Sequence, residues 1–177
     1  MPDFDADGNR ILNYQVSFTY DVEPGFSAQE DFGPGKYHVE ESGAASSMLK
    51  IVEEAFNGDL AQYLKKSKKM KVSLTGTADA TPIIRGIPYD GAYGEFDNEP
   101  VYVDRQLTAL TVDSKNPIKE NSQLAFIRAA GVKDYLEKNI PDYRSMPKDY
   151  RYEVNVSQDK GSEFRRITAA FIFVDAF

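Results

Sequence analysis

The segment 121–136, NSQLAFIRAAGVKDYL, has the periodicity of a helix but carries a charge where a helix normally places apolar side chains. At about 100° per residue, six of its apolar side chains fall on one arc of about 140°, which should face a core. Arg128 lies inside this arc, and Asn121 points the same way. Burying a guanidinium without a partner costs several kcal/mol, so the segment predicts a carboxylate or a set of carbonyls facing Arg128. The apolar positions of the arc are Leu124, Ala125, Ala129, Val132, Tyr135 and Leu136.

The composition limits the classes of protein to which the chain can belong. Its 177 residues are 41% hydrophobic, enough for one domain with a buried core. The formal charge of −7, with no basic face large enough to follow a phosphate backbone, argues against a nucleic-acid binder. The lysine-rich run 65–71 is best explained as a solvated helix end, with a polymer-facing patch as the less favoured alternative.

Three absences narrow the chemistry of the chain and its cellular setting. The chain has no cysteine, which excludes a disulfide framework, thiol catalysis and cysteine-bound zinc. It has no apolar run long enough to cross a bilayer, so no membrane span is expected. The first ten residues lack the pattern of a signal peptide, and an exported protein would therefore contain this chain as a mature or excised piece.

Strands are predicted where apolar side chains alternate with polar ones. This alternation occurs in 12–22, in 72–76 and in 150–156. The last strand, at about 164–175, is apolar on both faces and is therefore predicted to be central in the sheet. The strands are separated by helical segments, which indicates a layered α/β arrangement.

A second helix and a long loop lie between the first two strands. Apolar side chains recur at steps of three and four residues in 44–66, and this predicts a helix that Asn57 and Gly58 could kink or split. The segment 23–43 is punctuated by proline and glycine and is predicted to be a loop. Its histidine, His38, is expected to have a surface or packing role, because the sequence has no second histidine for a metal site or a proton relay.

The segment 80–120 is acidic, bears tyrosines and is punctuated by glycine and proline, so its periodicity is weak. Within it, 105–112 could form an extra strand. Its carboxylates are best explained as a solvated loop face; a calcium or substrate contact is less favoured, and a catalytic pair least, because nothing brings two of them together. Phe126 and Ile127, apolar but outside the arc of the following helix, indicate that this segment or a partner covers them.

The first residues contain the opening of a calcium-binding pattern. Asp3, Asp5, Asp7 and Gly8 spell D-x-D-x-D-G, in which alternate carboxylates converge on a cation. The pattern then fails, because its twelfth position is Tyr14 rather than glutamate and no helix precedes it. A polar lead-in to a strand is favoured, the three aspartates stay weak metal candidates, and no cofactor is predicted.

Four motifs, taken with the order of the elements, resemble those of one family. Gly76-Thr77-Ala78-Asp79 is similar to G-x-T-D at the end of a second strand, and 121–136 matches N-x-x-L-[S]-x-x-R-A-x-x-V-x-x-x-L in register. Ile140-Pro141 follows as Gly-Ile-Pro often does, and Arg165-Arg166-Ile167 is similar to R-R-V in a last strand. The family is the OmpA-like domain, the peptidoglycan-binding module of Gram-negative envelopes.

The resemblance implies an α/β (α+β) two-layer sandwich with a mixed sheet and two main helices on one face. The expected order is β-α-β-(insertion)-α-β-β in a single domain over 1–177, with a first unit at 10–79, the insertion at 80–120 and a last unit at 121–177. The sequence departs from the family at the insertion, which lies beside or over the expected site. Ala78 and Ala125 also replace the usual threonine and serine, so two hydroxyl groups are missing.

The resemblance also implies a ligand, the diaminopimelate of the peptidoglycan stem peptide. Asp79 would bind its ammonium and Arg128 its carboxylate in a bidentate contact, while Asn121 would bridge ligand and backbone. Thr77 could supply a missing hydroxyl, although its side chain would point differently, and Leu124 belongs to the helix motif. The implied location is periplasmic and associated with the outer membrane.

Three functional classes stay open at this point. The first is non-catalytic binding to the cell wall. The second is a protein-assembly module of an envelope complex, in which Asp79 and Arg128 form only a structural salt bridge and the insertion contacts other envelope proteins. The third and least favoured is an enzyme, because the chain has no cysteine, a single histidine and no serine in a nucleophile-elbow context.

Overall fold

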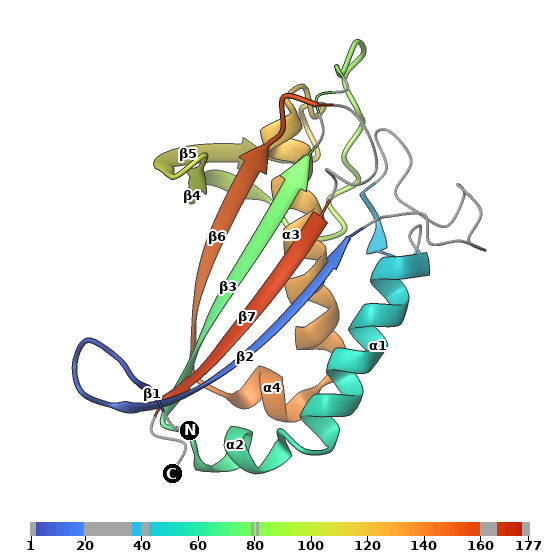
Figure 1. Ribbon diagram of the computed structural model, residues 1–177. Helices are drawn as coiled ribbons and strands as arrows, with labels where there is room; N and C mark the ends of the chain where they lie inside the picture. Colours follow the sequence, from blue (N-terminus) through green and yellow to red (C-terminus); the bar gives the residue numbers. More distant parts are fainter. Residues whose placement is uncertain are drawn as a thin grey trace.

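The computed structural model describes residues 3–19, 37–39, 43–78, 80, 82–159 and 166–174. These residues form a sheet and four helices (Figure 1). No helix in the described ranges combines the length and apolarity that crossing a bilayer requires. The elements are β1 Asp3–Phe4, β2 Arg10–Thr19, α1 Gly43–Asn57, α2 Ala61–Lys66, β3 Lys69–Ala78, β4 Phe96–Val103, β5 Gln106–Val112, α3 Asn121–Asn139, α4 Pro141–Ser145, β6 Lys148–Val156 and β7 Arg166–Val174.

The sheet is mixed, with the strand order β1-β2-β7-β3-β6-β4-β5. β6 runs parallel to β3 and to β4, whereas β7 runs antiparallel to both β2 and β3. The coarse prediction of a mixed α/β (α+β) fold is therefore confirmed. The strand at the end of the chain, β7, is central as predicted, because it lies between β2 and β3.

The two main helices pack on the same face of the sheet. Side chains along β3 alternate strictly between buried and half-buried, as the pleat of a strand requires. The buried face of β3 lies under α3, and the same face of β7 meets Phe56 of α1, whose ring centroid is 4.9 Å from that of Phe171. Figure 1 shows α1 and α3 beside each other, with α2 and α4 closing one end of the layer.

One predicted helix is interrupted in the structure. The helix predicted over 44–66 is two helices, α1 and α2, with the break at Asn57 and Gly58 that the sequence indicated. Its cause is local, because Gly58 and Leu60 both donate backbone hydrogen bonds to the carbonyl of Ala55 and so close a turn. The outer ends of the first and last predicted strands, 20–22, 164–165 and Asp175, lie outside the described residues.

The insertion contains a hairpin that extends the sheet, so the prediction of a solvated loop was incomplete. β4 and β5 are joined by Asp104 and Arg105, both with positive φ, which is the geometry of a two-residue hairpin turn. β5 matches the extra strand predicted at 105–112, whereas β4 was not predicted. β4 then pairs with β6 through Tyr102 and Val103, and the amide of Asp104 donates to the carbonyl of Val154.

The insertion also covers the outer side of α3. The ring of Phe96 meets that of Phe126 edge-on, with centroids 4.8 Å apart, and both Phe126 and Ile127 are fully buried. Further along α3, Gly131 leaves room for Tyr93, since a Cβ at this position would come within 2.9 Å of the tyrosine ring. Of the two coverings that the sequence left open for Phe126, the insertion is the one observed.

Candidate functional site

The start of α3 is fixed by side chains, and this start positions the residues of the predicted site. Gln123 accepts hydrogen bonds at Oε1 from the backbone amides of Lys119 and Glu120, at 2.9 and 3.1 Å. Its Nε2 donates to the carbonyl of Thr111 at 2.9 Å. These bonds satisfy amides before the first helical turn and hold that turn against β5.

Arg128 is buried, as its place on the apolar arc predicted. The residue is 1% exposed, and its neighbours Ala125 and Ala129 are fully buried. A guanidinium keeps its charge in any protein environment, so its burial commits the surrounding structure to solvating or pairing that charge. Arg128 therefore sets the strongest electrostatic requirement in this part of the fold.

The end of β3 lies directly against the first turns of α3. A Cβ placed on Gly76 would be 2.3 Å from the carbonyl oxygen of Ala125, so only glycine permits this approach. The chain continues from Ala78, which is 1% exposed and accepts a hydrogen bond from the amide of Ser157. Asp79, the predicted partner of Arg128, lies outside the described residues, and their pairing stays a prediction.

The other predicted site residues divide between two places. Leu124 is buried and Asn121 half-buried, and both belong to the first turns of α3, the helix that carries Arg128. Thr77 does not join them. Because Gly76 and Ala78 face α3, the alternation of β3 directs Thr77 to the opposite face of the sheet, where it is half-buried. The prediction that Thr77 supplies a hydroxyl to a site with Arg128 is therefore corrected.

The acidic start of the chain forms a hairpin loop between β1 and β2. Asp5 accepts hydrogen bonds at Oδ1 from the amides of Asp7 and Asn9, at 3.0 and 2.9 Å, and Asn9 also donates to its Oδ2. These bonds from Asn9 lower the pKa of Asp5. The favoured prediction of a polar lead-in to a strand is confirmed, and no group of three metal-binding side chains occurs in the described ranges.

Residues 37–39 hold the insertion in place, a contact that the sequence did not reveal. The backbone amide of Val39 donates to the hydroxyl of Tyr93 at 2.8 Å, and the hydroxyl of Tyr37 donates to the carbonyl of Pro88 at 3.3 Å. His38 Nε2 lies 2.6 Å from Asp90 Oδ2. His38 thus has the packing role predicted for it, within a clasp between the β2–α1 connection and the insertion.

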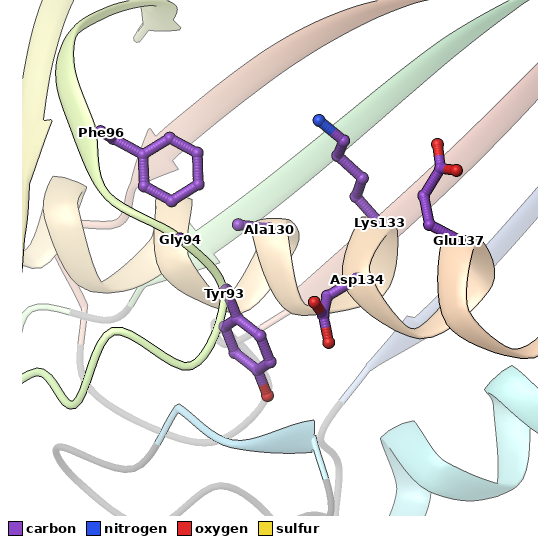
Figure 2. Close-up of a pocket in the computed structure, with 7 residues that line it drawn as sticks. All are labelled: Tyr93, Gly94, Phe96, Ala130, Lys133, Asp134 and Glu137. Carbon is purple, nitrogen blue, oxygen red and sulfur yellow. The ribbon is translucent and has the colours of Figure 1, made fainter. Parts of the chain in front are cut away.

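A cavity of about 180 Å³ lies between the insertion and the outer face of α3 (Figure 2). Its acids already have partners. Asp134 Oδ2 is 3.0 Å from Nζ of Lys138, and Glu137 accepts a hydrogen bond from the hydroxyl of Tyr150 at 2.7 Å. The cavity thus offers paired carboxylates and aromatic walls rather than a reactive group. Its lining consists of Tyr93, Gly94, Phe96, Ala130, Lys133, Asp134 and Glu137.

Next to this cavity, a buried polar cluster joins the end of α3 to β6. The hydroxyl groups of Tyr143 and Tyr150 are 2.8 Å apart, and Lys148 Nζ is 3.5 Å from Glu137 Oε1. Burial, followed by its two neighbours Tyr143 and Glu137, raises the pKa of Tyr150. A phenol with a raised pKa is a poor proton source near neutral pH, so the geometry gives this cluster a structural role.

A phenol between the two main helices makes the stability sensitive to alkaline pH. The Tyr135 hydroxyl donates to Glu53 Oε2 at 2.8 Å, and burial together with this carboxylate raises the pKa of Tyr135 from 10.0 to about 12. Because the folded state holds this proton more tightly, the contribution is complete below pH 10 and is lost as pH rises to 12. Between these two pH values, the free energy of unfolding measured with denaturant should fall less steeply for Tyr135→Phe than for the parent protein. Equal slopes for the two proteins would contradict the prediction.

Comparison of the chain with family models, with curated proteins and with solved structures found no match in any of the three.

Proposed function

We propose that the chain is a non-catalytic module that binds cell-wall peptidoglycan through the diaminopimelate of the stem peptide. The observation that carries the proposal is the burial of Arg128 on α3, about one turn after Ala125, whose backbone lies against Gly76 near the end of the strand that leads to Asp79. The element order, strand, helix, strand, insertion, helix and two strands, supports an OmpA-like topology. We place the protein in the periplasm, associated with the outer membrane.

The ligand chemistry suits a site between a strand end and a helix start. The distal carbon of diaminopimelate carries an ammonium and a carboxylate together, and such a zwitterion requires an anion and a fork of donors a few ångströms apart. Arg128 would bind the carboxylate with two parallel hydrogen bonds, and Asp79 would bind the ammonium. Asn121, half-buried at the first residue of α3, has a donor and an acceptor on one amide and could bridge the two.

The burial of Arg128 predicts how such binding behaves. With 1% of the residue exposed, a ligand carboxylate reaches the guanidinium only when the covering side chains give way. That rearrangement lowers the apparent affinity of a single site in proportion to the fraction of open molecules. Firm attachment would then come from several copies of the protein on a polymer that repeats the same stem peptide.

A second candidate is the protein-assembly module, and the exposure of the insertion favours it. Ile84 is 90% exposed and Leu107 64%, and these are the two highest exposures among the described large hydrophobic residues. Both belong to the insertion, whereas Arg128 is buried. In this alternative, Arg128 and Asp79 form only a structural salt bridge, and the insertion contacts another envelope protein.

Co-sedimentation with purified sacculi of the diaminopimelate type tests the proposal. Arg128→Lys keeps the charge but loses the bidentate fork, and Asp79→Asn keeps the shape but loses the charge. Each removes a charge-assisted contact of about 1.5 to 3 kcal/mol, so the apparent affinity should fall about tenfold or more. Bound and free protein are quantified over a range of sacculus concentrations.

Thr77→Ala is the matched control, since Thr77 lies on the far face of the same strand and should leave sedimentation unchanged. Thermal unfolding of every variant separates the two candidate functions. Loss of binding by a folded variant supports the wall-binding site, while variants that sediment like the parent protein would exclude it. Variants that lose their fold instead favour the structural salt bridge.

A further inference from the structure

The outer edge of β5 has no partner strand within the described ranges. β5 is the last strand of the sheet, and no described strand lies beyond it. Gln106, Leu107, Thr108 and Ala109 are all exposed. The other end of the sheet differs, because β1 has only two residues and is followed by an acidic loop. Proteins usually protect free strand edges with charged side chains, with proline or by keeping the edge strand very short, and β5 has none of these features.

The register of the hairpin shows which backbone groups face outward. A two-residue turn makes Val103 and Gln106 a hydrogen-bonded pair, and the pattern then alternates along the hairpin. Pro100, which has no N–H, falls opposite Ala109 at a position that needs no such bond. The N–H and C=O groups of Leu107 and Ala109 therefore point away from β4.

The far end of this edge is already occupied. The carbonyl of Thr111 also points outward, but it accepts the hydrogen bond from Gln123 Nε2 at 2.9 Å. A partner strand can therefore pair with the stretch from Gln106 to Leu110, which has the four free groups of Leu107 and Ala109. Pairing to such a short edge is selective for an extended strand, because main-chain groups form all of the hydrogen bonds.

We propose that this edge binds the same edge of a second copy of the chain, in an antiparallel register with Thr108 opposite Thr108. In this register Leu107 of each copy lies opposite Ala109 of the other. The N–H and C=O groups of both residues in each copy then form hydrogen bonds across the interface. The register also places the large side chain of Leu107 beside the small side chain of Ala109 in both pairs. The inference does not depend on the proposed wall-binding site.

Charge complementarity favours a second copy as the partner. No charged residue lies between Arg105 and Asp113, so two molecules of charge −7 meet along an uncharged strand. At each end of the paired stretch, Arg105 of one copy falls opposite Thr111 of the other and diagonal to its Asp113. Long side chains can reach across such diagonal positions, so each Arg105 would approach the Asp113 carboxylate of the other copy, which the Lys115 and Asn116 amides already hold in place.

A charge swap at Thr108 tests both the edge and its register. Thr108 is exposed, and the twofold axis places it opposite itself, so Thr108→Lys or Thr108→Glu brings two like charges together. Sedimentation equilibrium of the parent chain should show a weak dimer over a series reaching ~1 mM. Each single variant should lower the association constant about tenfold, and an equimolar mixture of the two should restore it.

Two further measurements keep the test decisive. Ile84→Lys, at an exposed insertion residue outside β5, should leave the association constant unchanged. Because the chain has no cysteine, Thr108→Cys introduces a single thiol, and mild oxidation should cross-link the dimer, whereas Ile84→Cys should not. A parent chain that stays monomeric throughout, a dimer indifferent to charge at Thr108, or a mixture that fails to restore association would overturn the proposal.

Discussion

Phe126→Ala is expected to lower the free energy of unfolding by about 3 to 5 kcal/mol, the usual range for truncating a fully buried phenylalanine. Phe126 is fully buried, and its ring lies edge-on to Phe96 of the insertion and to Tyr152 of β6, with centroids 4.8 and 5.0 Å away. The substitution therefore removes contacts on both sides of α3. Equilibrium unfolding in urea measures the change.

Phe4→Ala is the matched control, because Phe4 is 60% exposed and its truncation should change stability by no more than about 0.5 kcal/mol. Phe126→Leu refines the test, since leucine fills some of the space and should cost less than alanine. A loss below about 1 kcal/mol for Phe126→Ala would contradict the observed burial of Phe126 between the insertion and β6.

Gly76→Ala is expected to destabilise the fold by about 3 kcal/mol, the upper end of the range for overpacking a core. The added methyl group would lie 2.3 Å from the carbonyl oxygen of Ala125, and this oxygen belongs to the backbone of α3 rather than to a flexible side chain. Relief therefore requires the strand and the helix to separate. The midpoint and slope of urea unfolding give the change in free energy.

The adjacent Thr77→Ala serves as control, because Thr77 faces away from α3 and its replacement should cost about 1 kcal/mol or less. The same separation that destabilises Gly76→Ala would also open the approach to Arg128. If the wall-binding proposal is correct, any folded Gly76→Ala protein should sediment with sacculi to an altered extent. Equal stability of Gly76→Ala and the parent chain would contradict the observed closeness of β3 and α3.

The sequence predicted those elements in which burial produces a regular pattern of apolar side chains along the chain. The periodicity of 121–136 placed Leu124, Arg128 and Leu136 on the buried side of α3, and all three are buried. β7 was predicted to be central because both of its faces are apolar, and it pairs on both sides. In each case burial acts on residues close together in the chain, so a local pattern was enough.

Other elements could not be predicted because distant residues determine them. β4 contains Asp97, Glu99 and Pro100, and these hide the alternation that its pairing with β5 and β6 imposes. The turn at Asp104 and Arg105 lacks the glycine that usually identifies a hairpin from sequence.

The site was predicted unevenly for the same reason. Its residues on α3 follow from one helical pattern, whereas the face on which Thr77 lies depends on the contact between Gly76 and Ala125. The clasp of residues 37–39 on the insertion joins positions about fifty residues apart, between which no periodic signal exists. Its hydrogen bonds could not be predicted from the sequence, because they form only when the fold brings the two segments together.

The two ends of the described chain lie on either side of Ile11 in β2, and this arrangement determines how the domain would respond to mechanical load. Asp3 pairs with Ile11 and Ile11 with Val174, so force applied between the ends acts across the first rungs of the β2–β7 ladder. Antiparallel strands pulled from the same end separate rung by rung, like a zipper, instead of shearing all their hydrogen bonds together. The domain should therefore yield at low force when stretched by its ends.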